Sequence, residues 1–231
     1  MKVLAVDSSS ITASVAVLEE KKILAEFYIN AGLTHSQTLA PMIDAVIKSL
    51  GLHLPDIDLF AVTQGPGSFT GLRIGMATIK GMAIGVGKKC VGVSSLLAAA
   101  YASRAQGGIV VPCMDARRGE VYCAAFKSDK KNLTRIFEDS AISIDELGKI
   151  LETYNQEIKL VGDGAEMCYN TLGQNYNLRV ELMPDCQRYI RASMVGLAAL
   201  ESLGENQIVS AEEIKPKYLR VSQAERLLST K

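Results

Sequence analysis

The sequence predicts an α/β protein of two lobes, in which the same unit of strands and helices is built twice. An apolar segment that ends at an aspartate occurs at residues 2–6, before Asp7, and again at residues 109–114, before Asp115. Each is followed by the same order of elements: two more strands, a helix, a fourth strand, a glycine-containing loop and another helix. The 231 residues are 48% hydrophobic, enough to bury the core of one domain or of two small ones.

Short apolar segments separated by polar turns indicate the strands of the first half. Ser8, Ser9 and Ser10 form a polar turn after the first strand, and residues 19–22 form a hairpin turn. The expected strands of this half are residues 2–6, 12–18, 23–29, 59–63 and 90–93.

Residues 34–50 have the spacing of an amphipathic helix, with apolar residues three and four positions apart. Thr34 is placed to cap its first turn, and Pro41 should kink it because the proline ring removes a backbone donor. A second helix is expected at residues 70–87, and Ser94 is placed to cap a third. The apolar positions of the first helix are Leu39, Met42, Ile43, Val46, Ile47 and Leu50.

Glycines are concentrated around the second helix. Gly65 and Gly67 follow the fourth strand, where glycine lets the backbone come close to a phosphate or to another surface. Inside the helix each glycine costs about 1 kcal/mol relative to alanine. Ala77, Gly81 and Gly85 form a ridge of small residues four positions apart, which another helix or strand would approach closely. No Walker A lysine follows the loop, so close packing is the favoured interpretation and anion binding the alternative.

Gln106-Gly107-Gly108 marks the expected boundary between lobes at residues 1–106 and 107–231. In the second half, Gly162-Asp163-Gly164 takes the place of the first glycine loop. A final helix and a polar tail that begins at Pro216 are assigned to the second lobe. The expected elements are strands at 109–114, 120–126, 133–137 and 158–161 and helices at 144–151 and 190–203.

This order resembles the plan of the actin–hexokinase–Hsp70 superfamily, whose two ribonuclease H-like lobes hold nucleotide phosphates and metal at a cleft. By that analogy Asp7 and Asp115 would bind a hydrated magnesium ion or orient water, and Ser8 and Ser9 would donate to phosphate. ATP or ADP with magnesium is then the cofactor to consider. In the alternative, each aspartate caps backbone N–H groups of its own turn.

Composition narrows the function classes. Twenty-five basic residues balance twenty-five acidic ones, so an RNA-related role would have to come through a local patch or a partner. No uninterrupted apolar stretch approaches bilayer length, and the first apolar run is too short for a signal peptide. The five cysteines include no CxxC pair, which favours buried free thiols in a reducing cytoplasm. We expect a cytoplasmic protein without membrane contact.

The usual catalytic motifs are missing from the sequence. His35 and His53 are the only histidines, and a second metal ligand one helical turn after His35 would fall at Leu39. There is no HExxH motif and no GxSxG elbow, and Ser68 has no obvious general base nearby in sequence. We expect no metal site and no catalytic residue.

The segment QGPGSFTGLRIG, residues 64–75, resembles the signature of the bacterial TsaB family, also called YeaZ, of the glycoprotease-like (Gcp-like) superfamily. The start VLAVDSSS, the segment THSQTLAPMI and the terminal PKYLR with Gln223-Ala224-Glu225 match the family too. The match covers essentially the whole chain and is strongest before residue 120. The shorter core GPG is shared with the larger paralogue TsaD.

The resemblance implies an accessory subunit without independent activity. TsaB-like proteins bind TsaD and, with the ATPase TsaE, take part in forming threonylcarbamoyladenosine at the adenosine beside the tRNA anticodon. TsaD-like proteins carry two histidines on the first helix, where this chain has His35 and Leu39. The transfer is therefore expected of TsaD, and tRNA is contacted only indirectly. A self-sufficient ATP-binding kinase or ATPase, and a glycoprotease-like hydrolase, stay open as other classes.

The family pairs through the first two helices, either with a second copy as a homodimer or with the N-terminal lobe of TsaD. A bulky residue at Gly75 or Gly81 is expected to abolish pairing while the lobe still folds. Arg73 and Lys80 would be charges at the rim of this interface. The expected interface residues are Leu39, Met42, Ile43, Val46, Arg73, Met76, Ala77, Lys80 and Gly81.

Overall fold

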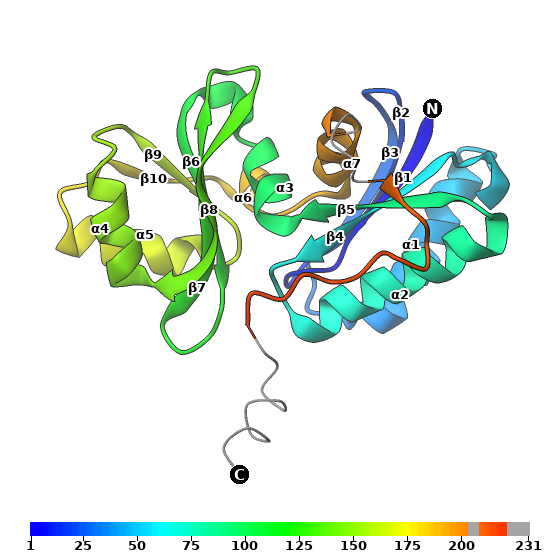
Figure 1. Cartoon of the computed structure of the whole chain (residues 1–231), viewed down its shortest axis with the longest axis horizontal. Helices are drawn as coiled ribbons and strands as arrows, with labels where there is room; N and C mark the ends of the chain where they lie inside the picture. Colours follow the sequence, from blue (N-terminus) through cyan, green and yellow to red (C-terminus); the bar gives the residue numbers. More distant parts are fainter. Residues whose placement is uncertain (203–207, 221–231) are drawn as a thin grey trace, which may run out of the picture.

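The computed structural model describes residues 1–202 and 208–220 and shows two α/β lobes side by side (Figure 1). Within the described residues, the first lobe holds a six-stranded sheet of order β11-β5-β4-β1-β2-β3. Strand β1 is buried on both faces, as a central strand must be when helices cover both sides of the sheet. The strands are β1 (Lys2–Asp7), β2 (Ala13–Glu19), β3 (Lys22–Ile29), β4 (Leu59–Gly65), β5 (Lys89–Ser94) and β11 (Ile208–Val209).

The second lobe repeats this sheet with the order β10-β9-β6-β7-β8. In both lobes the first strand pairs antiparallel with the second and parallel with the fourth. This correspondence confirms the predicted duplication and the two-lobed architecture of the actin–hexokinase–Hsp70 superfamily. The strands are β6 (Gly108–Asp115), β7 (Glu120–Ser128), β8 (Leu133–Ser143), β9 (Ile158–Val161) and β10 (Val180–Leu182).

Two helices, α1 (His35–Ser49) and α2 (Phe69–Val86), cover one face of the first sheet (Figure 1). Thr34 precedes α1, as expected, but its side chain makes no capping hydrogen bond, which corrects that prediction. The hydroxyls of Ser68 and Ser94 do accept hydrogen bonds from the Gly71 and Leu97 amides, at the starts of α2 and of α3 (Ser95–Tyr101).

The other face of the first sheet is covered by α3 (Ser95–Tyr101) and α7 (Ala192–Glu201). In α7, Gly196 lies so close to Leu18 that a Cβ there would overlap the leucine side chain. A short 3-10 helix, η2 (Arg104–Gln106), follows α3, and another, η1 (Leu54–Asp56), precedes β4.

The second lobe has α4 (Ile144–Glu152), α5 (Ala165–Asn175) and the single turn α6 (Asp185–Arg188). Helices α4 and α5 occupy the places of α1 and α2 in the repeat and enclose their own apolar core. Strand β8 continues to Ser143, beyond the predicted end at residue 137. Strand β10 and helix α6 were not predicted.

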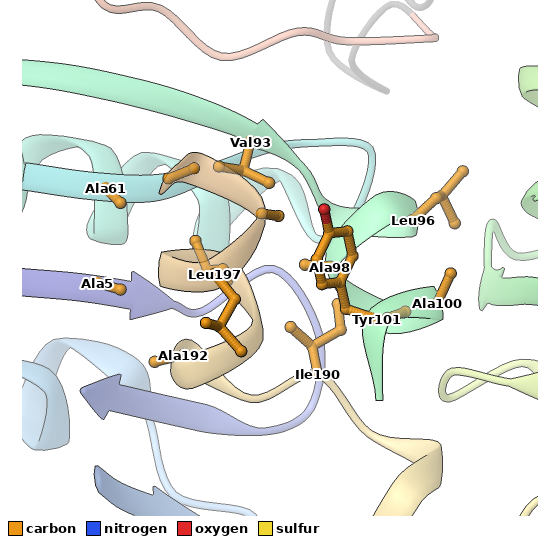
Figure 2. Packing of buried hydrophobic residues seen from close by; sticks show 14 of the residues in the cluster. Ala5, Ala61, Val93, Leu96, Ala98, Ala100, Tyr101, Ile190, Ala192 and Leu197 are labelled. Carbon is orange, nitrogen blue, oxygen red and sulfur yellow. The ribbon is translucent and has the colours of Figure 1, made fainter. Parts of the chain in front are cut away.

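One apolar core joins the two lobes. It includes Leu96 and Ala98 of α3, Leu197 of α7 and Ile190, which Figure 2 shows between the sheet of the first lobe and the second lobe. Phe126 of β7 belongs to the same core. The lobes are therefore held together by continuous apolar packing.

The C-terminal part of the chain returns to the first lobe, which corrects its assignment to the second. Helix α7 packs on β1 and β2, and β11 pairs antiparallel with the edge strand β5. The strands of the second sheet lie within residues 108–182, between the two parts of the chain that build the first sheet. The Gln223-Ala224-Glu225 motif lies outside the described residues. Among the described helices, none is both long enough and apolar enough to cross a membrane.

Candidate functional site

The glycine loop packs directly against the serine turn that follows β1. The Ser8 hydroxyl donates to the Gly71 carbonyl oxygen at 2.9 Å, and the Ser68 amide donates to the Ser9 carbonyl oxygen at 2.7 Å. A Cβ at Gly67 would overlap the Ser9 carbonyl, and a Cβ at Gly71 would overlap that of Ser8. Glycine is required here because backbone fills the space that a side chain would need.

The C-terminal segment approaches the same loop from the other side. The amide of Lys217 donates to the Gln64 carbonyl oxygen at 2.7 Å, and a Cβ at Gly65 would overlap the Lys217 carbonyl. Gly65 also has a φ of +122°, which side-chain-bearing residues rarely adopt. The space beside Gly65 and Gly67, considered above for a phosphate, is thus occupied by the chain's own backbone.

Asp7 is completely buried at the end of β1. Its Oδ1 accepts hydrogen bonds from the Ser9 amide at 3.1 Å, the Ser9 hydroxyl at 2.6 Å and the Thr63 hydroxyl at 2.7 Å. Its Oδ2 has no partner, and burial raises the pKa of this carboxyl, with the three hydrogen bonds acting in the opposite direction. The side chain organises its own turn, as the structural alternative expected.

Asp115 holds the equivalent turn of the second lobe but is exposed. Its Oδ1 accepts from the Arg117 amide at 2.7 Å, the same two-residue offset as between Asp7 and Ser9. Its other oxygen lies 3.2 Å from the Arg117 guanidinium. Both predicted aspartates therefore cap the turns that follow the first strands of the two lobes.

Asp163 was not predicted as a site residue. Its pKa is raised to about 6, mainly by burial and in smaller part by the charges of Asp115 and Asp7, against the lowering effect of hydrogen bonds from the backbone of Asp115 and of Asp163 itself. Its Oδ1 has no partner. The sequence signal was its place in Gly162-Asp163-Gly164, the counterpart of the first glycine loop. The charge of Asp7, from the first lobe, thus adds to the raised pKa of Asp163, in the second.

His35 contacts the serine turn that follows β1. Its Nε2 lies 2.8 Å from the Ser10 carbonyl oxygen, and its buried Nδ1 has no partner. Across residues 1–202 and 208–220, no group of three or more His, Cys, Asp or Glu side chains is arranged to hold a metal ion. The described side chains therefore do not fit a magnesium ion held by protein ligands alone.

Five of the predicted interface residues are buried in the first lobe itself. They form the side of α1 and α2 that packs on the sheet, so a partner cannot contact them without unfolding the lobe. The amphipathic stripe of α1, whose residues the family resemblance assigned to the interface, is the core-facing side of the helix. These residues, with their exposed fractions, are Leu39 (1%), Met42 (5%), Ile43 (2%), Val46 (0%) and Met76 (5%).

The two predicted rim charges bind the C-terminal segment of their own chain. The Arg73 Nε donates to the Tyr218 hydroxyl at 3.0 Å, and its guanidinium lies 3.9 Å from the centre of the Phe69 ring. The Lys80 Nζ donates to the Glu212 carbonyl oxygen at 2.6 Å. Both side chains therefore fasten residues 212–218 along α2.

The outward side of α2 carries the two remaining residues of the predicted interface, Ala77 and Gly81. Ala77 and Gly81 are exposed, and no heavy atom lies within 4 Å of the Cβ positions of Gly81 and Gly85. Ile84, which was not among the predicted interface residues, is 49% exposed on the same helix. Gly75 faces the Ser8 hydroxyl inside the lobe, so a bulky residue there would disturb folding, which corrects the expectation for that position. We call Ala77, Gly81, Ile84 and Gly85 the α2 outer face.

Fold and site together define the class of protein: a two-lobed α/β protein with the duplicated sheets of the actin–hexokinase–Hsp70 fold, whose glycine loop is packed by its own backbone. The TsaD family model, described as tRNA N6-adenosine threonylcarbamoyltransferase, matches residues 28–227. A full-length relative from Escherichia coli, named tRNA threonylcarbamoyladenosine biosynthesis protein TsaB, is 30% identical, with all of both chains covered. The chain belongs to the TsaB family.

Two further comparisons place the chain among its relatives. A Pseudomonas aeruginosa structure described as similar to peptidase YEAZ superposes with a TM-score of 0.81 at 24% identity, covering 95% of this chain and 99% of that one; at this identity it shows the fold alone. A tRNA N6-adenosine threonylcarbamoyltransferase of Jannaschia sp. is 35% identical over 82 residues, 36% of this chain and 23% of that protein. The second match links the chain to the larger transferases over one segment.

Proposed function

We propose that this chain is an accessory subunit that binds and supports a TsaD-like transferase in forming threonylcarbamoyladenosine on tRNA. The observation that carries the proposal is the α2 outer face. It is a surface of small residues with an exposed isoleucine, on a helix that the family resemblance assigns to partner binding. Membership of a family whose relatives are named for this modification supports the same conclusion.

The outer face has the geometry that helix packing requires. Helices pack with axes about 8–10 Å apart, and the smallest separations need small residues at the contact. Gly81 and Gly85 leave open space above the helix surface, and Ile84 would lose its exposure to water under a second helix. The matching lobe of a TsaD-like paralogue, or of a second copy of this chain, is built to the same plan and would supply such a helix.

The remaining assignments in this proposal rest on the family resemblance. The TsaD-like partner carries out the transfer and contacts tRNA, so this chain meets tRNA only indirectly. A TsaE-like ATPase joins the complex of the two. A homodimer uses the same α2 outer face and therefore competes with the TsaD-like partner.

Gly81→Trp tests the proposal, with Gly173→Trp as its matched control. Gly173 is an exposed glycine of α5, the counterpart of α2 in the second lobe, and the nearest atom to its Cβ position is 3.8 Å away. In size-exclusion chromatography with the TsaD-like paralogue, Gly173→Trp should co-elute with it and Gly81→Trp should not. Co-elution of both variants, each folded by circular dichroism, would refute the α2 outer face as the binding surface.

Nucleotide binding near Asp7 and Asp163 is the second candidate function. The observation that favours it is that the Oδ2 of Asp7 and the Oδ1 of Asp163 have no hydrogen-bond partner. It is weaker because the glycine loop is filled by backbone. Calorimetry with ATP and magnesium, on the chain alone and then with the TsaD-like paralogue, separates the two. Micromolar binding by the chain alone that is lost in Asp7→Asn would establish the nucleotide site.

A further inference from the structure

The described C-terminal segment, residues 208–220, runs from the sheet edge of the first lobe along α2 to the space between the lobes (Figure 1). We call it the strap. Its start is anchored by the pairing of β11 with β5 and by Ala211 and Ile214, which are buried in the core of the first lobe. Its course is therefore set by packing of the chain itself.

The middle of the strap is fixed to the start of α2. The Lys217 amide donates to the Gln64 carbonyl oxygen, and the Tyr218 ring stacks on Phe69 with the ring centres 4.7 Å apart. Arg73 contacts both residues, through its hydrogen bond to the Tyr218 hydroxyl and the position of its guanidinium over the Phe69 ring. Backbone and side-chain contacts of different kinds thus hold residues 217 and 218 in one place.

The end of the strap reaches the second lobe. The Arg220 guanidinium forms an ion pair with Glu120 at the start of β7 and donates to the Ala116 carbonyl oxygen at 3.3 Å. Its side chain is only 16% exposed. Ala116 and Glu120 flank the turn that Asp115 organises, so the strap connects this turn to the glycine loop.

The strap and the apolar core join the lobes at different places. The core lies around α3 and α7, whereas the strap enters between the lobes on the side away from α7 (Figure 1). Apolar packing is non-directional, so it selects among small rotations of the lobes less strictly than directional contacts do. A directional ion pair and hydrogen bond away from that contact restrict those rotations.

We propose that the strap is an interlobe brace, in which Arg220 locks the orientation of the second lobe against the glycine loop and α2. The PKYLR motif then has a structural purpose: Lys217 and Tyr218 attach the strap to the first lobe, and Arg220 attaches it to the second. The brace acts in the chain by itself and does not depend on a partner.

The distance between spin labels on the two lobes tests the brace. Cys186 is the exposed cysteine and lies in α6 of the second lobe, while the other four cysteines are buried. A second label is introduced by Ala45→Cys at an exposed position of α1. Double electron–electron resonance on the full chain should give one narrow distance distribution, which broadens with Arg220→Ala.

The partner substitution and a control make the result decisive. Glu120→Gln removes one side of the ion pair without changing side-chain size and should broaden the same distribution, and its combination with Arg220→Ala should add little more. Arg118→Ala removes an exposed arginine from the same turn and should leave the distribution unchanged. An unchanged distribution in folded Arg220→Ala, or equal broadening by Arg118→Ala, would overturn the proposal.

Discussion

The Ser8 hydroxyl and the Gly71 carbonyl oxygen are joined by a 2.9 Å hydrogen bond, and the Ser8 carbonyl fills the space where a side chain at position 71 would lie. This contact seats the first turn of α2 on the turn after β1. It also explains why a helix tolerates glycine at this position, and it gives the first prediction.

Gly71→Ala should destabilise the protein by about 1–3 kcal/mol, because the new methyl group must displace backbone rather than a flexible side chain. Gly85→Ala is the control on the same helix. Nothing lies within 4 Å of its Cβ position, so it should leave stability unchanged or raise it by up to about 1 kcal/mol. Urea unfolding followed by circular dichroism measures both. An unchanged free energy of unfolding in Gly71→Ala would contradict this prediction, because it would show that the serine turn moves away from the new methyl group at little cost.

Asp163 should make stability fall as pH rises from about 4 to about 6. Its pKa is about 6 in the folded chain against 3.8 for an ordinary aspartate, so the folded state binds the proton more tightly over that window. The difference corresponds to up to about 3 kcal/mol. Asp163→Asn should flatten this part of the pH profile and raise stability at pH 7.5. If stability depends on pH in the same way in the parent and in Asp163→Asn, the raised pKa of Asp163 is wrong.

The thiols should divide into one reactive and four protected groups. Cys186 is exposed, and the other four are buried. Burial raises the pKa of Cys90 to about 11 and that of Cys123 to about 12, which further suppresses the reactive thiolate. Ellman's reagent should therefore modify one thiol rapidly in the native chain and five in denaturant. Rapid modification of a second thiol before unfolding would contradict the packing of the cores.

Most of the fold could be predicted from residue patterns in the sequence. The aspartates at the ends of β1 and β6 and the repeated order of elements predicted the duplicated sheets, because each strand and helix has a local signature of periodicity and turn residues. The return of α7 to the first lobe has no such signature. It depends on the close fit of Gly196 against Leu18, a contact between distant segments that one sequence does not display.

The site was predicted in part, for a related reason. Small residues in α2 signalled close contact, but the sequence does not say with what. Gly71 and Gly75 meet the serine turn, whereas Gly81 faces outward, although all have the same local context. The roles of Arg73 and Lys80 could not be predicted from the sequence, because the groups that they bind lie in the strap, far along the chain.

The central claim is that the α2 outer face supports the transferase reaction of a TsaD-like partner. Its most direct test is formation of threonylcarbamoyladenosine on tRNA, reconstituted from the TsaD-like paralogue, the TsaE-like ATPase and the threonylcarbamoyl donor, with and without this chain. Product should require the chain, should form with Gly173→Trp and should be lost with folded Gly81→Trp. Full product formation with Gly81→Trp, or without the chain, would contradict the account.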